Sequence, residues 1–182
     1  MSSIYVGGII LTRTTSSYNP TDGVAIDNIT ANNCVFETSG YTTGKIWDFR
    51  KTNSNTLGTI KMSNCLFKTL QTNYKYGSLT CNADLLILDN CTFDYINNNE
   101  QAFQLLNLSS GVYKLINCNI PKVGEIAPYI DINNAKAYFD KLISNAKIRI
   151  FNNAKVLLQY SSYNSIEGNT EQNCKIDSFD MS

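Results

Sequence analysis

The chain contains no histidine, and this absence removes several kinds of chemistry at once. Histidine is the commonest general base, the commonest metal ligand and the usual partner of a serine or cysteine nucleophile. No two of the six cysteines have the C-x-x-C spacing that a zinc site built from cysteines requires. The sequence therefore gives no sign of a metal centre or of a histidine-activated nucleophile, and we predict neither a cofactor nor a metal.

Surplus charge and long apolar runs are missing as well. Lys+Arg and Asp+Glu number 15 each, so the basic surplus that nucleic-acid binding usually needs is absent. No apolar run approaches the roughly 20 residues of a membrane span, and the apolar patch at 4–11 has no preceding positive region of a signal peptide. Only three prolines occur among 182 residues. We expect one domain, residues 1–182, with no nucleic-acid partner, no membrane span and no signal peptide.

What the chain does contain is a repeat built around an Asn-Cys pair. The pattern reads apolar, any, apolar, any, Asn, Cys, any, and then Phe or Ile. It is filled four times, with the pairs 31, 26 and 27 residues apart, by Ile29–Phe36, Ile60–Phe67, Leu86–Phe93 and Tyr113–Ile120. A period in this range is typical of a solenoid, in which each repeat is one coil that cannot bury its own apolar face.

Each Asn-Cys pair marks a corner in its coil. In Leu86, Leu88, Cys91 and Phe93 the apolar steps are two, three and two, whereas a flat strand would keep a step of two. Asparagine adopts the left-handed conformation of a corner more readily than other non-glycine residues, and stacked asparagines can hydrogen-bond in a ladder. The cysteines should form an inward column, and their parallel side chains suit disulfides poorly. We predict reduced, packed thiols.

A second strand follows each corner and has the pattern apolar, polar, apolar. It is found at Trp47–Phe49, Leu79–Cys81, Phe103–Leu105 and Ile130–Ile132. The middle residues should then form an outward column of polar side chains: Asp48, Thr80, Gln104 and Asp131. This column is the first place to look for a ligand-binding surface.

These patterns predict an all-β chain, a right-handed single-stranded parallel β-helix of about five to six coils. The regular coils span about 29–156, and 1–28 and 157–182 are expected to be end coils or caps that protect the open edges. Residues 135–145 carry apolar side chains at helical spacing, which predicts a short helix inserted into one coil.

The segments TIKMSNCLFKTL and LLILDNCTFDYINN resemble repeats of the pectate-lyase-like right-handed β-helix superfamily. They are more similar still to β-helix domains of surface proteins from gut Bacteroidetes, over roughly 29–156. The superfamily holds lyases, hydrolases, adhesins and phage tail spikes, so the resemblance is informative for fold rather than activity. It implies contact with a polysaccharide or surface glycan, at a cell surface or on a virion.

A catalytic site would have to use the residues that the superfamily's enzymes use. The resemblance implies acidic side chains, bound calcium in the lyases, and an Arg or Lys base, and the best candidates are Asp48, Arg50 and Lys51. Asp48 and Asp131 should lie three coils apart, or roughly 14 Å, which is too far for a carboxylate pair. An ordinary solvated sheet face explains these residues better, and calcium is expected only for a lyase.

Binding has more support in the sequence than catalysis. Four tyrosines lie in the loops after the Asn-Cys strands, where they could stack on sugar rings or fold back over the coil edges: Tyr41, Tyr74, Tyr76 and Tyr95. Together with Thr80, Gln104 and Asp131 they are the candidate ligand-binding residues. The sequence favours a non-catalytic binding module over a polysaccharide lyase or glycoside hydrolase.

A third reading is a phage tail or capsid-associated structural protein. Unpaired cysteines and a short chain without a signal peptide suit assembly in a reducing cytoplasm. Val35 and Leu66 both point outward by alternation and could form the longitudinal interface of a homotrimer. The alternatives for location are therefore the cell surface or extracellular space, as part of a longer secreted chain, and the virion.

Overall fold

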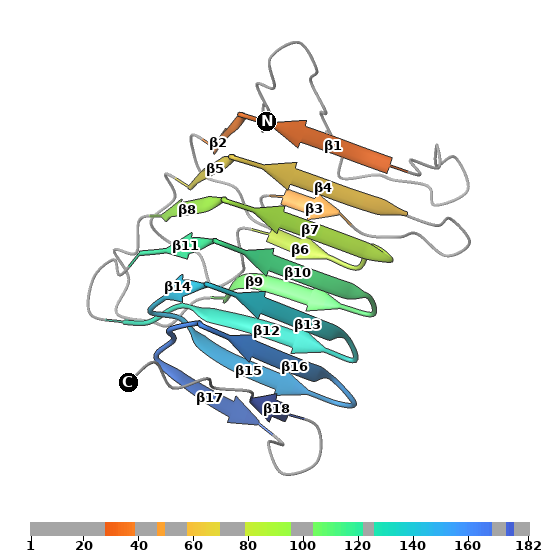
Figure 1. Ribbon diagram of the computed structural model, residues 1–182, viewed down its shortest axis with the longest axis vertical. Coiled ribbons are helices and arrows are strands. Elements are labelled where there is room, and N and C mark those ends of the chain that lie inside the picture. Colours follow the sequence, from red (N-terminus) through yellow and green to blue (C-terminus); the bar gives the residue numbers. More distant parts are fainter. Residues whose placement is uncertain are drawn as a thin grey trace.

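The described strands stack in three parallel sheets (Figure 1). The computed structural model describes residues 28–38, 47–49, 58–69, 79–95, 104–121, 126–168 and 174–176, and within these ranges there is no helix. The seven-stranded sheet 1 contains β1 (Asn28–Asn32), β4 (Thr59–Ser63), β7 (Leu85–Asp89), β10 (Val112–Ile116), β13 (Lys136–Asp140), β16 (Lys155–Gln159) and β18 (Cys174–Ile176).

The other two sheets complete the path of the chain. Sheet 2 contains β2 (Val35–Thr38), β5 (Leu66–Thr69), β8 (Thr92–Tyr95), β11 (Asn119–Ile120) and β14 (Ile143–Ser144). Sheet 3 contains β3 (Trp47–Phe49), β6 (Leu79–Cys81), β9 (Gln104–Ser109), β12 (Tyr129–Asn133), β15 (Lys147–Phe151) and β17 (Ser165–Gly168). From β1 to β15 the chain visits sheets 1, 2 and 3 in turn before returning to sheet 1, an arrangement consistent with a β-helix.

The core lies between the three sheets and follows from strand alternation. In β4, for example, Ile60 and Met62 are buried, whereas Lys61 between them is exposed. Equivalent inward residues of neighbouring strands stack on one another. The ring centroid of Phe67 lies 5.0 Å from that of Phe36 and 4.7 Å from that of Phe93, and the ring planes are nearly parallel. Each strand thus adds one layer to a continuous apolar column.

The corner predicted at each Asn-Cys pair is confirmed. Asn33, Asn64, Asn90 and Asn117 have φ values of 56°, 52°, 51° and 52°, in the left-handed region. The side-chain ladder is present but irregular. Asn90 Nδ2 donates to Asn64 Oδ1 at 2.7 Å, from one corner asparagine to the next. Asn64 Nδ2 donates instead to Asn32 Oδ1, and Asn117 Nδ2 to Asp89 Oδ1, each one residue before the corner.

The cysteines at these corners are reduced and packed, as predicted. Cys34, Cys65, Cys91 and Cys118 are buried free thiols, and Cys81 is a fifth. Each corner thiol donates to the carbonyl oxygen two residues earlier, as Cys65 does to Ser63 at 3.2 Å. Burial raises the pKa of the Cys65 thiol to about 11, so the thiol stays protonated in the folded chain.

The predicted helix at 135–145 is wrong. Lys136–Asp140 is strand β13, and Lys141 is the next left-handed corner, with φ 53°. Ala137 and Phe139 point inward on alternate positions, whereas Ala135 and Leu142 are buried because they lie beside corners. Two strand positions flanked by two corners imitate the helical spacing, because a corner shifts the alternation by one residue.

The stacking continues beyond residue 156 through β16, β17 and β18. The proposed N-terminal cap at 1–28 lies almost wholly outside the described residues.

Candidate binding face on sheet 3

The outward column of sheet 3 has a different membership from the prediction. The register pairs Thr80 with Asp48 on one side and with Asn107 on the other, and Asn107 with Asp131. Gln104 lies opposite Tyr129 instead, because the register shifts between Tyr129 and Ile130 and leaves one extra residue in β9. Beyond Asp131 the column continues with Arg149 and Glu167. Such bulges re-aim side chains, and this one turns Gln104 toward Asp131.

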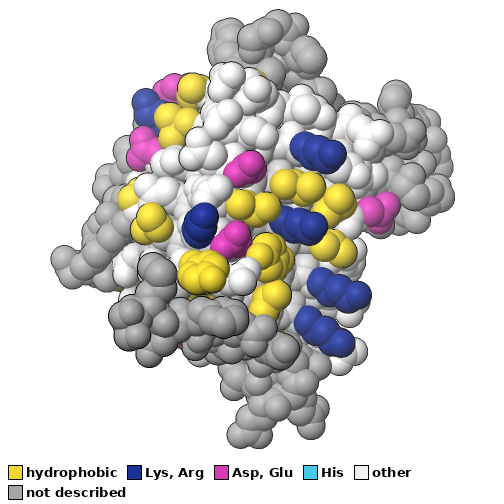
Figure 2. Space-filling model, in the orientation of Figure 1, with side chains coloured by type: hydrophobic (Ala, Val, Ile, Leu, Met, Phe, Trp, Pro, Cys, Tyr) yellow, Lys and Arg dark blue, Asp and Glu magenta, His cyan; other side chains and the backbone are white. Residues whose placement is uncertain are grey.

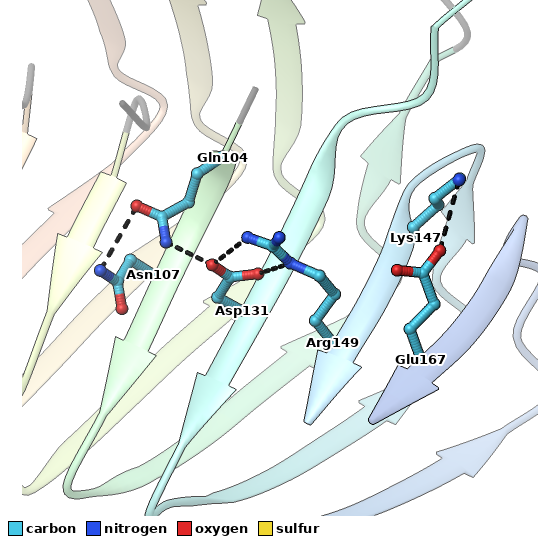
Figure 3. Close-up of polar contacts among 6 residues, drawn as sticks. All are labelled: Gln104, Asn107, Asp131, Lys147, Arg149 and Glu167. Atoms are coloured by element: carbon cyan, nitrogen blue, oxygen red, sulfur yellow. Dashed lines mark hydrogen bonds and ion pairs between the residues drawn. The ribbon is translucent and has the colours of Figure 1, made fainter. Parts of the chain in front are cut away.

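Asp131 and Arg149 form the centre of this face (Figure 3). Arg149 Nε lies 2.6 Å from Asp131 Oδ1, and Nη2 lies 2.6 Å from Oδ2, so the pair is bidentate. Gln104 Nε2 also donates to Asp131 Oδ2, and Asn107 Nδ2 donates to Gln104 Oε1 at 3.4 Å. Asp131 is only 5% exposed, and every contact to its carboxylate comes from a donor. The hydrogen bond to Asp131 raises the pKa of Arg149 above its ordinary value, although burial opposes the shift.

Two aromatic rings flank the Arg149 guanidinium. Its Cζ lies 3.7 Å from the Tyr129 ring centroid and 5.5 Å from that of Phe151. Phe151, at the end of β15, is 40% exposed. Lys147 Nζ lies 6.0 Å from the Tyr129 centroid and 3.3 Å from Glu167 Oε1. The outer face of β9, β12, β15 and β17 thus combines aromatic rings, side-chain amides and two ion pairs. We call Gln104, Asn107, Tyr129, Arg149 and Phe151 the binding face.

Four of these residues were missed by the sequence prediction: Asn107, Tyr129, Arg149 and Phe151. A signal for Arg149 existed, because Ile148-Arg149-Ile150 has the same apolar, polar, apolar pattern as Ile130-Asp131-Ile132. Placing the two segments on neighbouring strands would have put Arg149 beside Asp131. The inserted helix that we predicted between them hid this adjacency.

The remaining predicted site residues are buried, lie far from Asp131 in the column, or fall outside the described part of the chain. Thr80 is 2% exposed, and its Oγ1 makes no hydrogen bond among the described residues. Tyr95 is also 2% exposed, and its hydroxyl donates to the Pro121 carbonyl at 2.9 Å, so it folds back onto the coil. Asp48 lies in β3, three strands from Asp131 in the column. Tyr41, Arg50, Lys51, Tyr74 and Tyr76 lie outside the described residues.

The described carboxylates on this face are already paired. Asp131 is fully engaged by Arg149 and Gln104, and Glu167 is engaged by Lys147. A hydrolase needs two carboxylates free to act on one bond. Asp89 and Asp94 in the neighbouring coil offer no such pair either, because they lie beside Ser63 and Lys68 on the next strand.

No group of three or more His, Cys, Asp or Glu side chains within the described ranges could hold a metal ion. In the part of the chain that the structure describes, there is no helix with the length and apolar character needed to cross a membrane. No protein-family model, curated protein or solved structure matches this chain.

Proposed function

We propose that this chain is a non-catalytic binding module, a right-handed parallel β-helix of five to six coils that contacts carbohydrate through the binding face. The observation that carries the proposal is the pair of aromatic rings, Tyr129 and Phe151, on either side of the Arg149 guanidinium. Around them stand the amides of Gln104 and Asn107.

The combination fits the chemistry of a sugar. Pyranose rings present apolar C–H faces that pack on aromatic side chains, and hydroxyl rims that need donors and acceptors in fixed positions. Phe151 offers an exposed ring, while the ion pair and the amides hold polar groups in place beside it. Because Asp131 fixes Arg149 in a bidentate pair, the polar groups are ordered before a ligand arrives, which lowers the entropic cost of binding.

The two alternatives lack a supporting contact. A lyase or hydrolase at Asp48 would need a free carboxylate partner, and the described residue beside Asp48 on β6 is Thr80. A role in a phage tail or capsid, with a homotrimer along Val35 and Leu66, stays a prediction. So do the location, at a cell surface or on a virion, and calcium, which only a lyase would need.

A glycan array tests the proposal directly. We expect the wild-type chain to bind a subset of glycans, and Phe151→Ala to weaken that binding about five- to thirtyfold, the loss that corresponds to a stacking contact of about 1–2 kcal/mol. Phe151 is exposed, so its removal should leave the fold intact. Val35→Ala is the matched control, because Val35 is 46% exposed on sheet 2, away from the binding face.

A double variant, Tyr74→Ala with Tyr76→Ala, distinguishes the binding face from the tyrosine loops. Loss of binding in this variant with full binding in Phe151→Ala would move the site to the loops. No binding of the wild-type chain to any glycan on the array would contradict the proposal.

A further inference from the structure

The charged side chains around the binding face are paired with one another. Arg149 lies between two acidic residues, because the register places Asp131 on one neighbouring strand and Glu167 on the other. Asp131 holds Arg149 in the bidentate pair, and Glu167 pairs with Lys147 at 3.3 Å (Figure 3). These four side chains therefore carry no net charge.

The outer face of sheet 1 differs in this respect. Figure 2 shows basic and acidic side chains on both sides of its apolar residues. The lysines on this face form no ion pair within the described ranges: Lys61, Lys114, Lys136 and Lys155. A negatively charged ligand would find unpaired positive charge on sheet 1, whereas the positive charge of the binding face is already neutralised.

Burial makes the pair of Asp131 and Arg149 difficult to exchange. The side chain of Asp131 is 8% exposed, and that of Arg149 is 29% exposed. A ligand carboxylate could take the two donor atoms of Arg149 only by displacing Asp131, which would leave a buried carboxylate without its cation. The carboxylate of Glu167 on the next strand would also repel an incoming anion.

The same pair leaves uncharged hydrogen-bonding partners available at its edge. Arg149 Nη1 and Asn107 Oδ1 make no hydrogen bond within the described ranges. The first is a donor and the second an acceptor, and a sugar hydroxyl can pair with either. The exposed ring of Phe151 lies 5.5 Å from Arg149 Cζ and can pack on the apolar face of the same sugar.

We propose that the binding face selects neutral glycans, and that Asp131 excludes acidic ones by occupying the position on Arg149 that the carboxylate of a uronic acid would otherwise take. This inference rests on the proposed function and names its ligand class. Asp131 acts through Arg149, so it is a positioning residue that sets specificity by disfavouring the wrong ligand. Removal of its charge should turn the same face toward acidic sugars.

Matched oligosaccharides of equal linkage and length test the selectivity. Glucan with glucuronan, galactan with galacturonan and mannan with mannuronan differ in each sugar only by a hydroxymethyl group or a carboxylate. In isothermal titration calorimetry, we expect the wild type to bind the neutral member of at least one pair at least about tenfold more tightly than the acidic member. Raising NaCl from about 50 to 500 mM should change the Kd for the neutral member by less than about twofold, because salt screens charge.

Asp131→Asn keeps the shape of the side chain and removes its charge, so it releases Arg149 from the ion pair. It should tighten binding of the acidic member at least about fivefold, and about 500 mM NaCl should remove that gain. Adding Phe151→Ala should abolish the gain, whereas a gain that survives this addition would lie elsewhere, such as on the sheet 1 lysines, and would overturn the proposal. Glu167→Gln, at a side chain that is 43% exposed, should give a smaller gain of about twofold.

Glu37→Gln is the matched control, because it removes one negative charge from an exposed ion pair on sheet 2, where Glu37 lies 3.6 Å from Lys68. It should leave the preference for the neutral member unchanged. Circular dichroism shows whether each variant is folded, and if Asp131→Asn is not, the wild-type preference and Glu167→Gln decide.

The outcomes separate this inference from the proposed function. A wild type that binds the acidic member as tightly as the neutral one, or a folded Asp131→Asn without the gain, would overturn the inference alone. A wild type that binds no member of any pair would contradict the proposed function and the inference together.

Discussion

The corner between sheets 1 and 2 is made from different residues in the two halves of the stack. In the N-terminal half it is Asn-Cys, with the asparagine left-handed and the thiol donating to the carbonyl two residues earlier. In the C-terminal half, Lys141-Leu142 and Tyr160-Ser161 occupy the corner, and Lys141 and Tyr160 have φ values of 53° and 49°. The backbone path is therefore the same although neither residue of the motif is kept.

The two kinds of corner share their backbone hydrogen bonds and differ in their side chains. Lys141 N donates to Gln159 O at 3.0 Å, just as Asn117 N donates to Asp140 O at 2.9 Å. Ser161 Oγ donates to Gln159 O at 2.8 Å and lies 3.3 Å from Phe139 O. The Cys118 thiol contacts the two equivalent carbonyl oxygens of its own corner, those of Ile116 and Leu88. The stacked backbone dictates the corner, whereas an asparagine lowers its strain, and a thiol or hydroxyl at the second position adds hydrogen bonds where one is present.

The largest effect should come from the aromatic stack, which belongs to the Asn-Cys half. Phe67→Ala removes a ring that contacts both Phe36 and Phe93 and leaves a cavity in the core. We expect the free energy of unfolding to fall by about 3–5 kcal/mol in a urea titration. Val35 lies in the same sheet as Phe67 but points outward, so Val35→Ala should change the free energy of unfolding by less than about 0.5 kcal/mol. Equal effects of the two substitutions would contradict the inward assignment of Phe67.

The buried thiols should make this half of the molecule sensitive to high pH. Burial raises the pKa of Cys65 from its ordinary value of 9.0 to about 11. Above pH 9 the unfolded chain releases this proton while the folded chain keeps it, so the free energy of unfolding should fall as pH rises toward 11, by at most about 1.4 kcal/mol per pH unit. Other groups titrate in the same range, so the measurement is the difference between the wild type and Cys65→Ala. Identical pH profiles would show that Cys65 is not buried in this way.

A smaller loss is expected when a corner asparagine is replaced. Asn90→Ala loses the polar side chain that lets asparagine tolerate the left-handed region, and it removes the hydrogen bond to Asn64, so it should destabilise the chain by about 1–2 kcal/mol. Asn90→Gly removes the same hydrogen bond without the backbone strain and should cost less. Thermal unfolding of the two variants side by side measures the strain alone, and a glycine variant less stable than the alanine variant would contradict the left-handed assignment.

The reverse substitution should strengthen the C-terminal half. Lys141→Asn restores the asparagine of the earlier corners at a position with the same φ, and it should raise stability by up to about 1 kcal/mol. A scan of the melting temperature is enough to see this. A clear loss of stability would mean that Lys141 makes a contribution beyond its place in the corner.

The sequence was sufficient for features that repeat and insufficient for features that do not. The Asn-Cys corners and the inward thiols were predictable because four copies of one pattern fix the alternation. The strand at 136–140 was misread as helical because only one corner separates its inward residues from those of the next strand. The bulge in β9 escaped prediction because both Gln104 and Asn107 stand next to apolar residues, so the pattern alone allows either register.

The binding face was predictable only in part for a related reason. Asp131 was found from the apolar, polar, apolar pattern, but its partner Arg149 lies on a strand whose place in the stack depended on the misread segment. Tyr95 was assigned to a loop, but it is the last residue of β8 and lies inward two positions after Phe93, so strand alternation would have placed it in the core.

The most direct test of the account is a map of thiol reactivity in the folded chain. Alkylation with iodoacetamide at pH 8, followed by peptide mass spectrometry, reports each cysteine separately. We expect Cys34, Cys65, Cys91 and Cys118 to stay unmodified in the native state, to form no disulfide-linked peptides and to react fully in denaturant. Rapid alkylation of any of these four thiols in the native state, or a disulfide between two of them, would contradict the inward column on which the corners and the sheets depend.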